Sequence, residues 1–279
     1  MRGLAAAAAA AAFVALFLLE RARPLRPWAR PGLSRVARNL ALGGISAAVV
    51  LALQWATLRP FVSWAEGRGL GLLPRLPLPA PLATAAGVLL LDYTLWHWHR
   101  WNHVLPALWR FHLVHHVDRD LDASTGLRFH VGEMALSVAY RAAQVALLGA
   151  GARALDLWSG LLLVSILFHH SNLRLPLRLE RWLVRVVVTP RMHGIHHSER
   201  RDEVDTNFSS LLSCWDLLHG TLRLDVPQAR LVIGVPAFRQ ATALGFLSQL
   251  TLPFRRQEDS WPGQPRPPRT PRRALQLQA

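Results

Sequence analysis

Two short strings in this chain have the histidine spacing of a metal site. Both read H-x-x-H-H, and they lie at residues 112–116 and 193–197. On a helix, positions i, i+3 and i+4 lie on one face, so each string points three imidazoles the same way. Another pair just upstream, at residues 99 and 103, has the helical spacing i, i+4. The three strings predict eight ligands: His99, His103, His112, His115, His116, His193, His196 and His197.

The number of imidazoles limits the kind of metal site. Neutral imidazole binds iron, zinc, copper and nickel. A single zinc ion takes four ligands, which is fewer than this chain offers. The chain has one cysteine, Cys214, so the ligands must be nitrogen and oxygen. It has no E-x-x-H pair, which a carboxylate-bridged di-iron bundle would need. The count therefore favours a histidine-rich site for two metals, each with four to five nitrogens.

The composition indicates a membrane protein. Of the 279 residues, 51% are hydrophobic, and they gather in long runs. The 32 basic residues are all arginine, and the formal net charge is +15. Such a charge can indicate nucleic-acid binding. Because the arginines flank the apolar runs, we expect anionic lipid headgroups, and no nucleic acid, as their partners.

Five apolar runs predict membrane-embedded helices. They lie at 5–19, 40–58, 81–96, 134–150 and 154–168. The first run is interpreted as a membrane helix, because no convincing signal-peptide cleavage site follows it. The last two runs predict a helical hairpin, and the glycine- and proline-rich residues 59–79 predict an external connection. The arginine-rich loop 21–38 predicts the cytoplasmic side, which also places all the histidine strings there.

Two polar segments and one interrupted apolar run lead to further structural predictions. Residues 174–188 carry arginines at helical spacing among apolar residues and predict a helix lying on the membrane surface. The segment from Trp261 to the C-terminus is rich in proline and arginine and is predicted to be disordered. Arg141 and Gln144 interrupt the run 134–150. Because a charge within a span is costly, we expect this helix to begin later and Arg141 to reach the interface, with a role toward the substrate as the less favoured alternative.

The histidine strings resemble the histidine boxes of the fatty acid hydroxylase/sterol desaturase superfamily of integral membrane enzymes. Five neighbouring segments also resemble the motifs of that family: residues 92–96, 108–112, 128–133, 170–172 and 207–221. The resemblance spans roughly residues 88–222, which leaves 1–87 for N-terminal membrane helices and 223–279 for a C-terminal region. The chain departs from the family pattern at Val131, Ser209 and His219, and none of these replaces a ligand.

The resemblance implies an all-α polytopic membrane protein with about four to five membrane-embedded helices and a histidine-rich cytosolic cap. It implies a centre of two irons that activates O2 and hydroxylates or desaturates a C–H bond of a membrane lipid, such as a fatty acyl chain or a sterol. His130 and His170 join the eight ligands above on the same ground. The chain shows no dinucleotide-binding glycine motif, haem-attachment motif or cysteine set for an iron–sulfur cluster. A separate electron donor is therefore expected: a ferredoxin, a cytochrome or a reductase.

Several other side chains are expected to support the site. Three further histidines are expected to pack beside it or serve the structure: His97, His169 and His219. Five polar residues are candidates for orienting the imidazoles, with a helix cap or a surface charge as the alternative: Asp92, Glu133, Asp205, Asn207 and Asp216. Four tryptophans are expected either to wall the substrate path or to form an interfacial belt: Trp96, Trp98, Trp101 and Trp109.

Three other classes of protein remain as alternatives. A zinc-dependent membrane hydrolase would need a general base beside the metal, as in H-E-x-x-H, and that string is absent. A membrane haem protein would place histidine pairs inside the spans, whereas here they lie at the span ends. A metal-sensing or transport protein would place polar groups along the spans, which are largely apolar. Hydroxylation is favoured over desaturation, and the lipid and the carbon attacked stay open.

Overall fold

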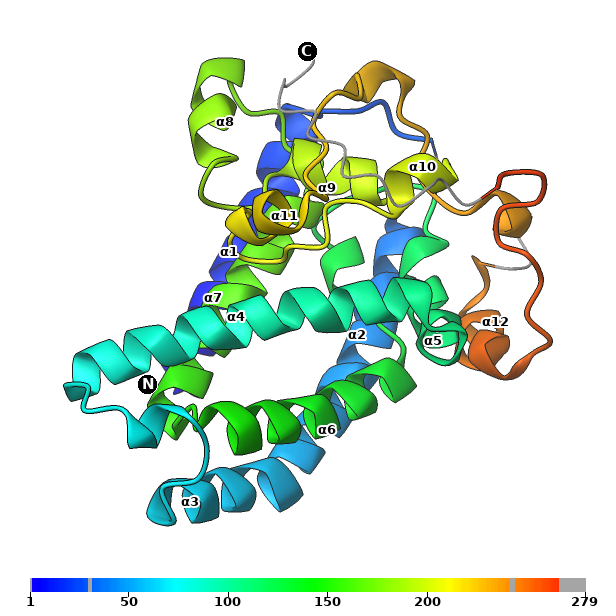
Figure 1. Ribbon diagram of the computed structural model, residues 1–279. Helices are drawn as coiled ribbons and strands as arrows, with labels where there is room; N and C mark the ends of the chain where they lie inside the picture. Colours follow the sequence, from blue (N-terminus) through cyan, green and yellow to red (C-terminus); the bar gives the residue numbers. More distant parts are fainter. Residues whose placement is uncertain (1, 30–31, 241–243, 266–279) are drawn as a thin grey trace.

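The computed structural model describes residues 2–29, 32–240 and 244–265. Within these ranges the chain is helical and has no β-strand, and its only pairing of extended backbone is three isolated β-bridges. Long helices form a bundle, and short helices and loops form a cap over one end of it (Figure 1). The predicted all-α fold is confirmed.

The N-terminal part contributes α1 (Arg2–Ala22) and a longer helical rod. The rod consists of α2 (Leu33–Leu53), one π-helical turn, η1 (Gln54–Leu58), and α3 (Arg59–Gly67). Pro60 does not end the rod, because it stands in the first turn of α3 directly after the π-helical turn. The prediction of an external loop from residue 59 is therefore wrong. The irregular connection begins only after Gly67 and contains η2 (Leu73–Arg75).

The next two helices meet at a sharp corner. The 25-residue helix α4 (Ala80–Val104) carries the apolar run and continues through the first histidine pair. It ends at Leu105, whose backbone is extended (φ −97°, ψ 115°), because the residue before a proline disfavours the helical conformation. The helix α5 (Pro106–His116) begins at that proline and carries the first H-x-x-H-H string. The corner thus brings two histidine strings together.

The two later apolar runs form α6 (Val131–Leu148) and α7 (Ala152–His170), joined by a short turn. The two helices diverge after this turn and both pack against α4, so the predicted side-by-side hairpin is not formed. Gly149 ends α6 with φ 69°, and a Cβ atom there would lie 2.3 Å from Cδ of Pro74. Only glycine meets both conditions without strain. Before α6 lies the short helix η3 (Thr125–Leu127). Because α6 begins at Val131, ten positions before Arg141, the prediction of a later helix start is wrong.

The apolar core lies among α3, η1, α4, α6 and α7. Leu91 of α4 and Trp158 of α7 are fully enclosed there, and Val145 of α6 is 1% exposed. This burial fixes the helices that carry the first histidine pair and the cavity described below.

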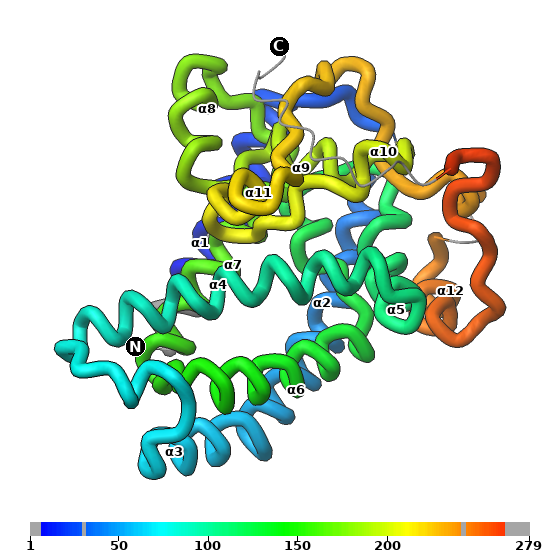
Figure 2. Tube along the Cα trace, in the orientation of Figure 1, coloured from blue at the N-terminus to red at the C-terminus, as the bar shows by residue number. Residues whose placement is uncertain are grey.

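The cap consists of four short helices, which lie together at the end of the bundle (Figure 2). They are α8 (Leu177–Leu183), α9 (Pro190–His196), α10 (Arg201–Val204) and α11 (Cys214–His219). The predicted surface helix 174–188 is thus shorter than expected. Its C-terminal part turns away to form a β-bridge between Val187 and Leu212.

The C-terminal region packs against α5. It contains η4 (Gln228–Arg230), η5 (Pro236–Phe238), α12 (Phe246–Thr251) and η7 (Leu252–Phe254). Trp261 is 6% exposed, and its ring lies 5.2 Å from the Trp109 ring, so the predicted disorder is wrong for this residue. The rest of the predicted disordered tail, from residue 266, lies outside the described residues.

Two stretches of the described chain are long and apolar enough to cross a membrane: Leu33–Gly67 and Ala152–His170. Large apolar side chains on them face outward, with Leu51 65%, Trp55 78% and Leu157 50% exposed. Soluble proteins rarely leave such surface open to water. The stretches therefore support a membrane protein, while the number of spans and the side of the membrane stay predictions.

Candidate metal centre

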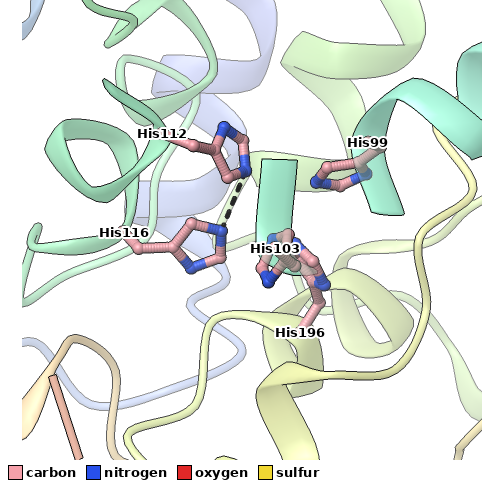
Figure 3. A group of neighbouring side chains, drawn as sticks. All are labelled: His99, His103, His112, His116 and His196. Atoms are coloured by element: carbon pink, nitrogen blue, oxygen red, sulfur yellow. Dashed lines mark hydrogen bonds between the residues drawn. The ribbon is translucent and has the colours of Figure 1, made fainter. Parts of the chain in front are cut away.

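Nine histidines form two groups that could each hold a metal ion. In each group one ring nitrogen per residue lies within 4.8 Å of the others, and every side chain is buried. The first group is His99, His103, His112, His116 and His196 (Figure 3). The second group is His115, His170, His193 and His197.

The two groups adjoin each other. Within the first, Nε2 of His112 and Nε2 of His116 are 3.2 Å apart (Figure 3). Within the second, Nε2 of His170 lies 3.0 Å from Nε2 of His115 and 3.0 Å from Nε2 of His193. Such distances between ring nitrogens fit imidazoles that converge on a shared ion. Each H-x-x-H-H string divides its histidines between the groups, so both strings serve both candidate sites.

Hydrogen bonds at Nδ1 orient five of the rings. Four of these nitrogens contact backbone carbonyls: His99 contacts Phe208, His115 contacts Arg128, His170 contacts Ile166 and His196 contacts Thr206, at 2.7 to 3.1 Å. The fifth, in His112, lies 2.9 Å from Oε1 of Glu133. A ring that donates its Nδ1–H in this way keeps a lone pair on Nε2, which is the form that binds metal.

Burial keeps the histidines of the two groups neutral. Removal from water lowers the pKa of His99, His103, His115, His116, His193 and His197 well below its usual value, and neighbouring histidines lower it further. The same burial lowers the pKa of His196 to about 3. Since a protonated imidazole cannot ligate, this environment keeps the donors ready for a metal at neutral pH.

The structure does not bring every predicted ligand into the two groups. His130 caps the N-terminus of α6, where its Nδ1 accepts the backbone N–H of Gly132 at 2.9 Å. Its Nε2 lies 3.1 Å from the carbonyl oxygen of Leu250, so both ring nitrogens have other partners. His169 lies beside the second group, with its ring 4.2 Å from that of His193. His97 and His219 pack against Trp96, away from both groups.

The five polar residues expected to orient imidazoles act in two ways. Glu133 contacts His112 directly, and Oδ1 of Asp205 lies 3.7 Å from Nδ1 of His103. The other three hold the loop that follows α10. Asp216 accepts the backbone N–H groups of Phe208 and Ser209, which places the Phe208 carbonyl against His99.

The remaining two of these residues complete the same loop. Asn207 adopts φ 54° and donates its side-chain amide to the carbonyls of Met192 and Arg223. Asp92 accepts the Trp215 indole N–H and the Leu212 backbone N–H, which ties the loop to α4.

A buried ionic network behind α5 was not predicted from the sequence. Arg35 of α2 forms ion pairs with Asp118 and Asp122 in the loop after the first H-x-x-H-H string, and Asn39 donates to Asp118 at 2.9 Å. Arg128, whose carbonyl contacts His115, donates to Asn39 Oδ1 at 2.7 Å. The network thereby fixes the carbonyl that orients a candidate ligand. No spacing rule in the sequence joins α2 to this loop.

A cavity of about 120 Å³ opens from both groups into the helix bundle. Rings of both groups line one end, including His112 and His193. Apolar side chains of α4, α6 and α7, such as Leu95, Met134 and Leu162, line much of the rest, together with a few polar side chains. Such a cavity suits a hydrocarbon chain that must bring one carbon close to the metals.

Comparisons with known proteins agree with this geometry. Residues 84–221 match the model of the fatty acid hydroxylase family. This segment contains all nine histidines of the two groups. Through it the chain belongs to the fatty acid hydroxylase/sterol desaturase superfamily, and the resemblance inferred from the histidine strings is confirmed.

Two curated relatives match part of this chain. An ornithine lipid hydroxylase, OlsE, of Rhizobium tropici is 34% identical over 64% of this chain and 52% of the relative. The human alkylglycerol monooxygenase is 27% identical over 54% of this chain and 33% of the relative. The chain thus spans about half or less of the curated relatives it matches. No solved structure gives a significant match.

Proposed function

We propose that this protein is an O2-dependent oxidoreductase of lipid metabolism that hydroxylates a C–H bond of a membrane lipid. The observation that carries the proposal is the pair of adjoining histidine groups at the end of a largely apolar cavity. A hydrocarbon chain in this cavity lies against both groups at once. The names of the relatives, a lipid hydroxylase and an alkylglycerol monooxygenase, favour hydroxylation over desaturation.

The donor set fits two irons. The nine grouped histidines would hold them, five around one ion and four around the other. Bound irons would supply the activation of O2 that an unreactive C–H bond requires. The protein holds its rings as neutral donors, and no carboxylate belongs to either group, so the ions would keep a high positive charge. His130 is left out of this set because both its ring nitrogens are engaged elsewhere.

The remaining parts of the proposal concern the setting of the reaction. The protein is proposed to lie in a membrane with its histidine cap on the cytosolic side, so that a lipid reaches the cavity from the bilayer. Residues 88–222 would form the catalytic domain and 1–87 further membrane helices. A separate ferredoxin, cytochrome or reductase would deliver electrons.

The metal content of detergent-purified protein tests the proposal first. Two irons per chain, with Mössbauer spectra of a coupled pair, are expected after growth in labelled iron. Lipid analysis of an expressing strain should then show a product heavier by one oxygen, formed only with O2. His112→Ala should abolish the product, whereas the control His219→Ala should not, because His219 lies outside both groups.

A zinc-dependent hydrolase is the alternative that this experiment separates. One zinc per chain that survives growth on iron, together with no O2-dependent lipid product, would refute the proposed oxidoreductase.

A further inference from the structure

A single arginine, Arg141, lies in the wall of the cavity. Arg141 of α6 lines the cavity together with rings of both histidine groups. Its Nη1 donates to Oγ of Ser137 at 3.4 Å, and its Nε is buried without a hydrogen-bond partner. Within residues 2–29, 32–240 and 244–265, no Asp or Glu forms an ion pair with Arg141.

Burying the guanidinium of Arg141 costs free energy unless a further group pairs with it. A charge inside a membrane-embedded bundle is expensive, and such residues face protein partners or a path for a substrate. The nearest aromatic face, that of Trp158, lies 5.7 Å from the guanidinium carbon and satisfies none of its N–H groups. Two buried arginines elsewhere in the fold, Arg35 and Arg191, form ion pairs with carboxylates. Two more, Arg26 and Arg128, form no ion pair within the described parts of the chain but donate to several amide and carbonyl oxygens, whereas Arg141 donates only to Ser137.

Arg141 lies on the same helix as a residue that contacts the first histidine group. Glu133, which contacts His112, lies eight positions earlier on the same helix. Because an α-helix rises 1.5 Å per residue, the two Cα atoms are about 12 Å apart along the axis. The hydrogen bond to Ser137 shows that the guanidinium reaches back one turn toward the histidines.

Further polar groups surround the same part of the cavity. Gln144, one turn beyond Arg141, donates to Oγ1 of Thr94 at 2.6 Å, and its Oε1 is buried without a hydrogen-bond partner. The hydroxyl of Tyr140 donates to the Thr94 carbonyl at 2.8 Å. Along α6 the cavity lining therefore runs from Glu133, beside the histidine groups, to a cationic, hydrogen-bonding part at Arg141 and Gln144.

We infer that Arg141 binds an anionic group of the substrate, a carboxylate or a phosphate, and so sets the distance from that group to the carbon that is oxidised. Guanidinium pairs with both anions through two parallel N–H bonds. An anion held there places a chain carbon several bonds away beside the histidine groups. The inference rests on the proposed function, because the oxidised carbon is defined by the metals.

Binding without turnover tests the inference separately from the proposed activity. Metal-loaded protein in a nonionic detergent, without electron donor and without O2, is titrated by calorimetry with octanoate, octyl phosphate and 1-octanol, which share one chain length. Octanoate, octyl phosphate or both should bind more tightly than 1-octanol. Arg141→Gln should weaken the anion roughly ten- to a hundredfold, as loss of a charged hydrogen-bond partner does, while Arg141→Lys should keep part of the preference.

Controls separate binding from folding. Arg153→Gln removes an exposed arginine near the start of α7 and should leave every titration unchanged. Arg141→Gln should melt no lower than the parent protein, because it removes a buried charge that has no ion-pair partner. The binding of octanoate rather than octyl phosphate, or the reverse, identifies the anion.

Two results would overturn the inference. One is equal binding of 1-octanol and both anions, and the other is anion binding that Arg141→Gln leaves intact. Neither result depends on hydroxylation, so the proposed activity stands or falls by the iron and product measurements alone.

Discussion

The rings of His116 and His197 stack at 4.3 Å between centroids, with 16° between their planes. They belong to different groups and to different H-x-x-H-H strings, 81 positions apart along the chain. This contact is where the two candidate metal sites adjoin. It also means that each string contributes donors to both candidate sites.

Removing donors from one histidine group should leave the other group able to bind its metal. Replacing His193 and His197 by alanine removes two of the four donors of the second group, while all five of the first remain. We expect the metal content to fall from about two ions per chain to about one, because too few nitrogens remain at the second site. Elemental analysis of the purified protein measures this. The matched control, His97→Ala with His219→Ala, should retain both ions, and loss of all metal from the first variant alone would contradict separate sites.

Glu133 should tune the affinity for metal without being a ligand. Glu133→Gln keeps an oxygen beside Nδ1 of His112 but removes the negative charge. Replacement of such a partner typically weakens metal binding about 10- to 100-fold. Competition against a chelator gives the affinity. Glu258→Gln, at an exposed position, serves as the control, and an unchanged affinity in Glu133→Gln would show that the carboxylate only packs there.

Acid should destabilise the metal-free protein. Burial lowers the folded-state pKa of His197 well below its usual value and that of His196 to about 3, whereas the unfolded chain titrates near 6.5. Below about pH 6.5 the unfolded state therefore binds more protons than the folded state, and stability falls as pH drops toward 3. Above that pH these groups add no pH dependence. Urea unfolding of chelator-treated protein at several pH values measures the effect, and a midpoint constant between about pH 7.5 and 5 would contradict it.

Breaking the buried network of Arg35 should cost much more than breaking an exposed ion pair. Arg35→Met leaves Asp118 and Asp122 buried without their cation. Such a loss typically costs about 3–5 kcal/mol in the free energy of unfolding. Arg59→Met removes the exposed pair with Asp156 and should cost at most about 1 kcal/mol. Equal midpoints of unfolding for the two variants would show that the network contributes nothing.

Two glycines, one in the turn after α6 and one within α7, should respond in opposite ways to alanine. At Gly149, alanine must adopt φ 69° and its Cβ meets Pro74, so the variant should lose more than about 1 kcal/mol of stability. At Gly160, within α7, no atom lies within 4 Å of the added Cβ. Alanine there should stabilise by about 0.4–1 kcal/mol, because it restricts the unfolded chain. Thermal melts of both variants give the comparison, and a stabilised Gly149→Ala would mean that the close turn after α6 is not formed.

The sequence by itself determined the family and nearly all of the candidate donors, because histidine spacing on a helix is local information. His99 and His103 share a face of one helix wherever that helix packs. The apolar runs likewise predicted α4, α6 and α7, because the length and hydrophobicity of a run can be seen in neighbouring residues alone. The sequence did not predict that the helix continues through Pro60, because this depends on a π-helical turn that no single residue type signals.

Only the tertiary structure decided which histidines face each other and what else they contact. The division of each string between two groups depends on how α5 and α9 approach, and the capping role of His130 depends on the distant Leu250 carbonyl. The same holds for Arg141. In the sequence it interrupts an apolar run, and the packing of α4, α6 and α7 around it turns that interruption into the one arginine that lines the described cavity. Long-range packing sets these relationships, and no local pattern encodes them.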